Sequence, residues 1–228
     1  MKPIGPFADP KVRKAMRLAI DTEKVLQAAY RGLGSAGEHH HVSPIHPEYY
    51  EQPFMSQAIA AAKALLAEAG HPNGIDAEIT IQPVSWEQAA VQAMVEMWKE
   101  AGINININIK PSAQYWETWA KVPFGFTAWT HRPLGVMVLG LAYRAGVPWN
   151  ESSYDNPEFD RLLTKAEGIL DVEARRKIMQ QLETIMQEDG PIVQPLWRSV
   201  FTAMDKKVRG FEMHPTSYLF ANEWALES

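Results

Sequence analysis

The sequence contains no cysteine. This absence excludes disulfide bonds, thiolate metal ligands and cysteine nucleophiles. The longest apolar run lies near residues 135–142, well short of the ~18 to 20 apolar residues of a membrane-spanning helix. The first ten residues, MKPIGPFADP, lack the charged segment and apolar core of a signal peptide. That last absence is neutral, because an exported protein loses its signal peptide.

Basic runs and catalytic motifs are also absent. The formal net charge is -5, which argues against a nucleic-acid groove. The chain has no Gly-x-Ser-x-Gly, no P-loop, no Gly-x-Gly-x-x-Gly and no His-Glu-x-x-His. We therefore predict that it is not an enzyme. With 228 residues, 46% of them hydrophobic, the chain can build one large domain or two small ones.

Helix boundaries are the strongest local signals present. They occur in three phrases: DPKVRKAMRLAID (residues 9–21), AKALLAEAGHPNG (62–74) and YDNPEFDRLLTKAEGILDVEARRKIMQQLETIMQEDGPIVQPLW (154–197). Asp9 caps a helix that begins with Pro10, and Asn156 and Asp171 open two more. Gly70 provides a left-handed helix end. Each phrase carries apolar residues at helical spacing, which predicts one buried face per helix.

Strand signals alternate with these helices. Residues 78–83 (EITIQP) predict a strand, and Ser85 with Gln88 predicts a capping box that opens a helix. Residues 103–110 (INININIK) alternate Ile with Asn, so we expect one buried and one polar face. Residues 125–130 and the stretch 193–211 read as further strands. Strand, helix, strand in this order predicts a partly parallel sheet, and hence an α/β fold with a mixed sheet flanked by helices.

The three phrases, in this order, resemble the second half of the bacterial extracellular solute-binding proteins of family 5, which serve peptide, opine and nickel ABC importers. The resemblance implies one lobe of a two-lobed periplasmic binding protein (type II-like), with helices on both faces of the sheet. Residues 1–228 are then a single domain, lobe two, and about 193–228 begin the return to lobe one. It implies a periplasmic protein without cofactor that captures a small solute by hinge closure. The expected partners are the solute, permease subunits in the inner membrane, and a missing lobe one, so we expect an excised or truncated form of a longer receptor.

The ligand loop departs from the peptide-binding branch of that family. There a Trp-x-x-Asp loop pairs with the free ammonium of a peptide; here the matching text is AWTHRPLG. Trp129 is kept, and Arg132 stands at or near the Asp position. A cation cannot hold an ammonium, whereas the guanidinium fork suits an anionic group. Two alternatives stay open: Arg132 pairs with a local carboxylate and points away, and His131 is a turn residue instead of a cleft donor.

The segment LAYRAGVPWNESSY follows that loop. In the family it lines the cleft, which implies four more ligand-binding candidates: Tyr143, Arg144, Trp149 and Asn150. Trp149 either stacks on the solute or belongs to the core. Trp86 and Tyr115 are further candidates, with a place in the core as the alternative.

The histidine-rich segment GEHHHVSPIHPEYY offers a different interpretation. His39, His41 and His46 are candidate ligands for nickel, copper or zinc, which would make the chain a metal or metallophore receptor. His40 points to the other side of an extended chain, and no helical His-x-x-x-His pair supports the site. We therefore predict a structural loop with no metal. A third alternative is an interaction domain that binds no small molecule.

Overall fold

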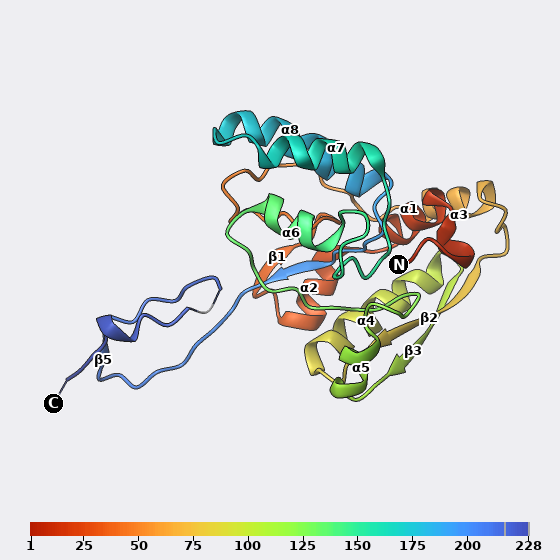
Figure 1. Ribbon diagram of the computed structural model, residues 1–228. Helices are drawn as coiled ribbons and strands as arrows, with labels where there is room; N and C mark the ends of the chain where they lie inside the picture. Colours follow the sequence, from red (N-terminus) through yellow and green to blue (C-terminus); the bar gives the residue numbers. More distant parts are fainter. Residues whose placement is uncertain (217, 228) are drawn as a thin grey trace.

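The computed structural model describes residues 1–216 and 218–227 (Figure 1). Its α-helices are α1 (Pro10–Leu18), α2 (Thr22–Tyr30), α3 (Ile59–Glu68), α4 (Ser85–Glu100), α5 (Ser112–Thr118), α6 (Gly135–Ala142), α7 (Pro157–Glu167) and α8 (Val172–Glu188). Short 3-10 helices are η1 (Gly5–Ala8) and η2 (Ala221–Glu223). Within the described ranges, no helix is both long and apolar enough to cross a membrane.

The strands of the described residues form pairs. Antiparallel β1 (Gly34–Ala36) and β4 (Leu196–Arg198) make one pair, parallel β2 (Ile75–Ile81) and β3 (Ile103–Ile109) another, and antiparallel β5 (Val208–Arg209) and β6 (Ala225–Leu226) the third. The predicted α/β class is confirmed, and so is the parallel β2–α4–β3 unit. The mixed sheet is divided into separate short pairs.

The β2–β3 pair has one buried and one polar face, as the Ile-Asn alternation predicts. Ile103 and Ile105 are buried and belong to the same apolar cluster as α4. On the other face, Asn104 donates to the Asp76 carboxylate at 3.0 Å, and a second such pair lies further along the strands. This exposed polar ladder means that helices cover one face of the pair, where the family resemblance implied both.

The predicted helix caps are confirmed at the starts of α1, α7 and α8 but not at the start of α4. The side chains of Asp9, Asn156 and Asp171 each accept a backbone N–H from the first turn of α1, α7 and α8. Gly70 ends α3 with a φ of 86°. The capping box is wrong: Ser85 is already the first residue of α4, and the residue before it provides no side-chain cap.

The predicted strand at 125–130 is wrong. Gly125 makes a single parallel bridge to Thr80, and the chain then leaves the sheet. The Phe126 carbonyl, which a strand would offer to a neighbour, accepts the Tyr115 hydroxyl at 2.8 Å. A side chain from α5 thus takes the hydrogen bond on which the strand depended, and the segment becomes a loop.

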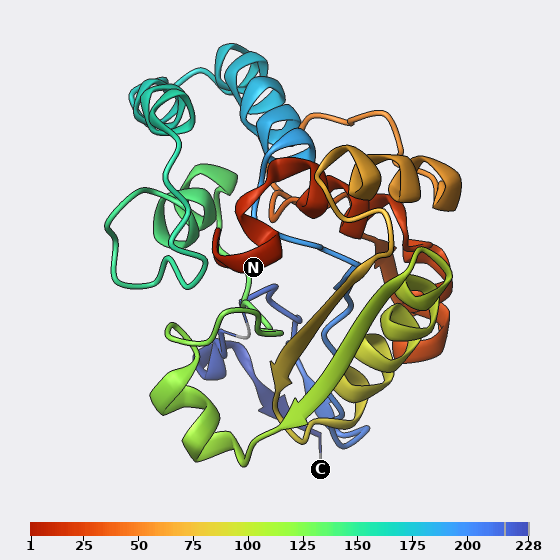
Figure 2. The same ribbon diagram turned by 90° about the vertical axis from the view of Figure 1, so that its right-hand side faces the viewer.

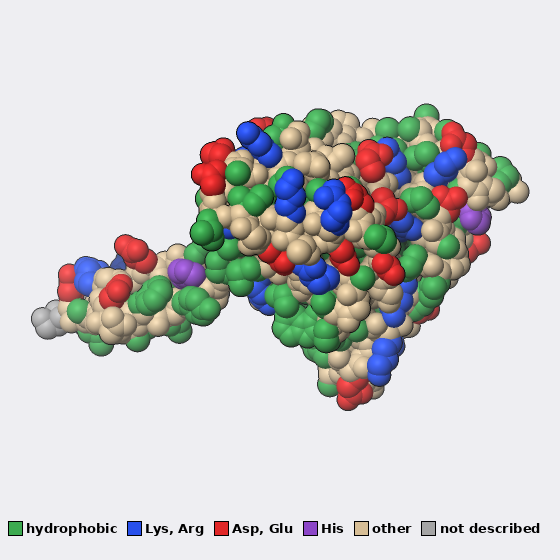
Figure 3. Space-filling view, turned by 45° about the horizontal axis from the view of Figure 1, so that its top comes forward, with side chains coloured by type: hydrophobic (Ala, Val, Ile, Leu, Met, Phe, Trp, Pro, Cys, Tyr) green, Lys and Arg blue, Asp and Glu red, His purple; other side chains and the backbone are tan. Residues whose placement is uncertain are grey.

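The predicted strands of residues 193–211 are confirmed only at β4 and β5. Beyond residue 199 the chain projects away from the body (Figure 1) and carries many apolar side chains on its surface (Figure 3). The exposed ones are Val200, Phe201, Met204, Met213, Tyr218, Leu219, Phe220 and Leu226. The side chains at positions 213, 215 and 216 reach back to the cavity described below.

Two apolar clusters form the interior. One lies among α1–α4, β2 and β3, and the other among α6, α7 and α8. Figure 2 shows α1 (red) beside the end of α8 (blue), where the clusters meet. There the buried Arg17 guanidinium donates to the Gly190 carbonyl at 2.6 Å and to the Glu188 carbonyl at 3.0 Å. The Glu188 carbonyl is the last of α8 and the Gly190 carbonyl follows the helix, so Arg17 satisfies the end of α8 and joins the two clusters.

A buried carboxyl in α8 predicts a pH effect on stability. Glu183 is fully buried, and burial, with Glu38 and Glu48 adding repulsion, raises its pKa to about 9. In the unfolded chain the pKa is 4.5, so only the unfolded state ionises between these values. Stability is therefore full below pH ~4.5 and falls as the pH rises toward about 9.

We expect Glu183→Gln, which imitates the protonated carboxyl, to unfold at the same urea concentration as the parent near pH 4.5. At pH 8 the variant should be more stable, by on the order of 2 kcal/mol. Urea titrations at both pH values measure the difference. Glu173→Gln on the exposed face of α8 is the control and should change neither value. Equal stability of variant and parent at pH 8 would contradict the prediction.

Candidate ligand-binding site

A cavity of about 560 Å³ is bordered by residues of both apolar clusters. Loops and strand β4 provide most of its wall, with residues from 41–46, 122–132, 142–152 and 191–200. Loops held by packed helices and strands are common places for binding residues, because the scaffold fixes them while their side chains remain free to contact a ligand. A cavity of this size accommodates a small molecule.

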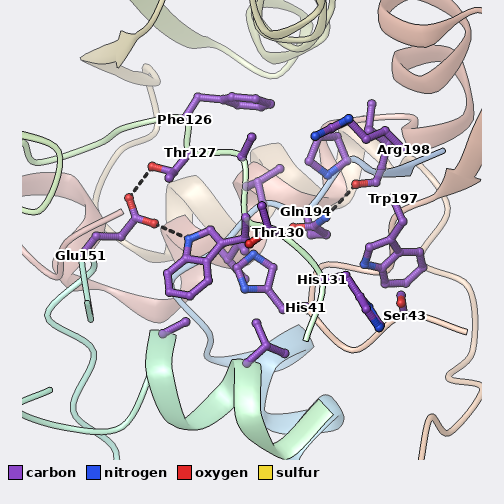
Figure 4. Close-up of a pocket in the computed structure, with 18 of the residues that line it drawn as sticks. His41, Ser43, Phe126, Thr127, Thr130, His131, Glu151, Gln194, Trp197 and Arg198 are labelled. Carbon is purple, nitrogen blue, oxygen red and sulfur yellow. Dashed lines mark hydrogen bonds between the residues drawn. The ribbon is translucent and has the colours of Figure 1, made fainter. Parts of the chain in front are cut away.

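Glu151 anchors one side of the cavity (Figure 4). Thr127 donates its hydroxyl to the carboxyl at 2.6 Å, and the Trp129 indole N–H donates to the other oxygen at 3.0 Å. Thr127 in turn lies 2.7 Å from the Tyr115 hydroxyl. Burial raises the pKa of Glu151, and the two hydrogen bonds act against this rise. Glu151 was not among the residues expected from the sequence, although it is the only acid in residues 143–154.

The Trp129 loop lies along the cavity wall, and Trp129, His131 and Arg132 all line it. Arg132 donates to the Thr130 hydroxyl at 2.7 Å and to carbonyls of its own loop. The His131 ring stacks on His46 with 4.9 Å between centroids, and His46 Nε2 lies 3.0 Å from the Arg132 carbonyl. Among the described residues no carboxylate forms an ion pair with Arg132.

Tyr143 lies in the cavity wall and Trp149 beside it. The Tyr143 hydroxyl is 3.1 Å from His41 Nδ1, and both residues line the cavity. Trp149 stands edge-on to Trp129, 6.1 Å between centroids, and is 47% exposed. Trp149 is therefore not a core residue; it does not line the cavity itself but contacts Trp129, which does.

Arg144 and Asn150 do not line this cavity. Arg144 turns to α7, where it donates to Glu167 at 2.7 Å and to Thr164 at 3.0 Å. The Asn150 amide donates to the Tyr154 carbonyl at 2.8 Å and to the Arg144 carbonyl, and so fastens its own loop. Both polar groups are therefore satisfied locally, and neither contributes to the wall of this cavity.

A second arginine in the wall was missed from the sequence. Arg198, at the end of β4, lines the cavity with its guanidinium carbon 5.4 Å from the centre of the Trp86 ring. Trp86 also lines the cavity, whereas Tyr115 is fully buried. Strand β4 has only three residues, so the alternation of its side chains is too brief to show on which face Arg198 lies. No sequence signal therefore identified Arg198.

The histidine segment does not converge on one point. His41 and His46 line the cavity, but His39 does not; it is fully buried, with a φ of 63°. Burial lowers the pKa of His41 to about 3 and that of His39 well below its usual value. Across residues 1–216 and 218–227, no group of three or more potential ligand side chains is placed to hold a metal ion.

An α/β scaffold that presents a loop-lined cavity of this size has the form of a small-molecule binding module. Residues 2–151, more than half of the chain, match the family described as bacterial extracellular solute-binding proteins, family 5 Middle. The chain belongs to this family.

Several proteins are similar to the chain. Heme-binding protein A of Haemophilus influenzae is 28% identical over 94% of the chain and 41% of that protein. The periplasmic murein peptide-binding protein MppA of Escherichia coli is 28% identical over 82% of the chain and 37% of that protein. The glutathione-binding protein GsiB of Pectobacterium atrosepticum is 23% identical over 96% of the chain and 45% of that protein.

Solved structures show the same fold. HbpA2 from Haemophilus parasuis matches 99% of the chain and 46% of its own, with a TM-score of 0.80 and 27% identity. The murein tripeptide binding protein MppA of Escherichia coli matches 98% of the chain and 46% of its own, with a TM-score of 0.85 and 21% identity. The chain thus spans less than half the length of these relatives.

Proposed function

We propose that the chain is the second lobe of a periplasmic receptor that captures a peptide-like, opine or other small anionic solute for an ABC importer. The receptor closes by a hinge between its lobes, and permease subunits in the inner membrane receive the solute. Membership of the family supports the general role, and the names of relatives that bind murein peptide and glutathione support a small, acidic, peptide-like solute.

The position of Arg132 is the observation that carries this proposal. Its side chain lines the cavity beside Trp129, and its hydrogen bonds within the described residues go to neutral oxygens of its own loop. A guanidinium that faces a cavity without a carboxylate partner attracts an anionic group of a solute. The proposed ligand-binding set is therefore Trp129, His131, Arg132 and Tyr143, together with Trp149, which contacts the Trp129 ring.

The fold also supports the assignment of residues 1–228 to one lobe. β4 pairs with β1, so residues up to about 199 stay within the body. The projecting segment beyond carries the exposed apolar side chains described above (Figure 3). We propose that this segment starts the return to lobe one and that lobe one covers those side chains, because apolar patches of this kind mark interfaces.

A titration with matched solutes tests the function. Isothermal titration calorimetry of the two-lobed receptor that contains this chain, with glutathione, acidic dipeptides, an opine and neutral dipeptides, should give saturable binding of the acidic compounds. Each should bind at least ~10-fold tighter than its neutral counterpart, since one charge-assisted contact is worth about 1.5 to 3 kcal/mol. No saturable binding by any compound, or a preference for the neutral ones, would contradict the proposal.

A further inference from the structure

Two charged groups face each other across the cavity, and neither belongs to the Trp129 loop. We propose that Glu151 binds the ammonium group of the solute, in place of the carboxylate that this loop lacks, and that Arg198 on the opposite wall binds one of its carboxylates. The solute is then an amino-acid conjugate or short peptide with a free amine and at least two carboxylates, one for Arg198 and one for Arg132. This inference rests on the proposed function and refines its substrate class.

Glu151 has hydrogen-bonding capacity left over. A carboxylate offers about four lone-pair positions, and Thr127 and Trp129 occupy one on each oxygen. The remaining positions are available on a side chain that lines the cavity. Because both protein donors are neutral, the negative charge itself is uncompensated by them. An ammonium group that enters the cavity would supply the missing positive charge.

The charges around Glu151 agree with this role. No ion pair involves it among the described residues. The cation that acts on its pKa is the α-ammonium of Met1, which also lines the cavity. That amino group donates to the Pro191 carbonyl at 2.8 Å; burial lowers its pKa to about 5, and the charge of Glu151 opposes this shift.

Arg198 faces the cavity from the other side. Figure 4 shows Glu151 with Thr127 on one side and Arg198 with Trp197 and Gln194 on the other. The guanidinium packs on Trp86, and in residues 1–216 and 218–227 it makes no ion pair. Arg198 forms no ion pair with Glu87. Burial raises the pKa of the Glu87 carboxyl to about 7, and the positive charge of Arg198 opposes this rise. The planar fork thus remains free to take a carboxylate in a bidentate fashion.

Removal of one solute charge at a time tests the assignment. Glutathione has one ammonium and two carboxylates, and its N-acetylated form lacks the ammonium. The parent two-lobed receptor, titrated calorimetrically at pH 7, should bind glutathione at least ~10-fold tighter than N-acetylglutathione, because only glutathione makes the charge-assisted contact. In Glu151→Gln this preference should fall below twofold. The Gln carbonyl still accepts the Trp129 indole N–H, so the variant removes the charge and keeps the indole in place.

Substitutions distinguish the role of Glu151 from that of Arg198, and they distinguish this inference from the proposed function. Arg198→Gln should weaken both probes by a similar factor, at least ~10-fold, and keep the preference for the amine. Glu158→Gln, on the exposed surface of α7, is the matched control and should behave as the parent. If the parent binds both probes equally, or if Glu151→Gln weakens both equally, Glu151 only positions Trp129 and the inference is wrong, while the proposed function stands. If the parent binds neither probe and no acidic solute of the panel, both are wrong.

Discussion

Replacement of Arg132 by alanine is expected to weaken solute binding more than ~30-fold, because loss of one partner of a buried charge pair costs about 2 to 5 kcal/mol. Arg132 lines the cavity, and its hydrogen bonds within the protein reach only neutral oxygens of the Trp129 loop. The anionic end of the solute would therefore lose its principal partner. The measurement is a calorimetric titration with the tightest acidic solute of the panel.

Two further substitutions at this position sharpen the prediction. Arg132→Lys should recover only part of the affinity, because an ammonium lacks the bidentate fork. Arg132→Asp should abolish binding of the acidic solute, and we expect some affinity for free-amine peptides to appear. The reason is that a carboxylate then stands where the peptide-binding branch has one.

Arg144→Ala is the matched control for Arg132→Ala. The same charge is removed from the segment that the family resemblance places at the cleft, but the structure directs Arg144 to Glu167 on α7. Binding should change less than twofold. An Arg132→Ala variant that binds as tightly as the parent would place Arg132 outside the site, and a large loss in Arg144→Ala would contradict its placement on α7.

The largest effect on stability is expected at Arg17. Arg17→Ala should lower the free energy of unfolding by about 3 kcal/mol or more, because it strips buried carbonyls of a charged donor and leaves a cavity. The variant loses the hydrogen bonds from Arg17 to the Gly190 and Glu188 carbonyls, and the Arg17 side chain is fully buried. Burial, with Arg13 nearby, lowers the pKa of Arg17 to about 9, so the guanidinium is still charged at pH 7.

Urea unfolding at pH 7, followed by tryptophan fluorescence and circular dichroism, measures this loss. Since Arg17 joins the two apolar clusters, the two probes should also cease to coincide in the variant, as separate transitions require. Arg161→Ala, which removes an exposed arginine from an i,i+3 pair with Glu158, is the control and should leave the midpoint unchanged. A loss below ~1 kcal/mol for Arg17→Ala would show that other contacts hold the clusters together.

The sequence by itself determined the features that depend on neighbouring residues. Asp9, Asn156 and Asp171 cap their helices because a short acceptor side chain reaches N–H groups two or three residues away. The alternation in 103–109 gave β3 its buried and polar faces for the same reason, since side chains of a strand alternate whatever lies beyond them. The three phrases and their order also sufficed to identify the family.

Only the tertiary structure decided which polar groups face the cavity. Arg144 and Asn150 lie in the segment that the family resemblance selects, yet each finds partners on α7 or in its own loop. Glu151 and Arg198 are far apart in the sequence and meet at one cavity through the packing of loops. The strand predicted at 125–130 is absent for the same reason, because the Tyr115 side chain on α5 donates its hydroxyl to the Phe126 carbonyl. Where a side chain points depends on contacts between distant segments, and a local pattern holds no information about them.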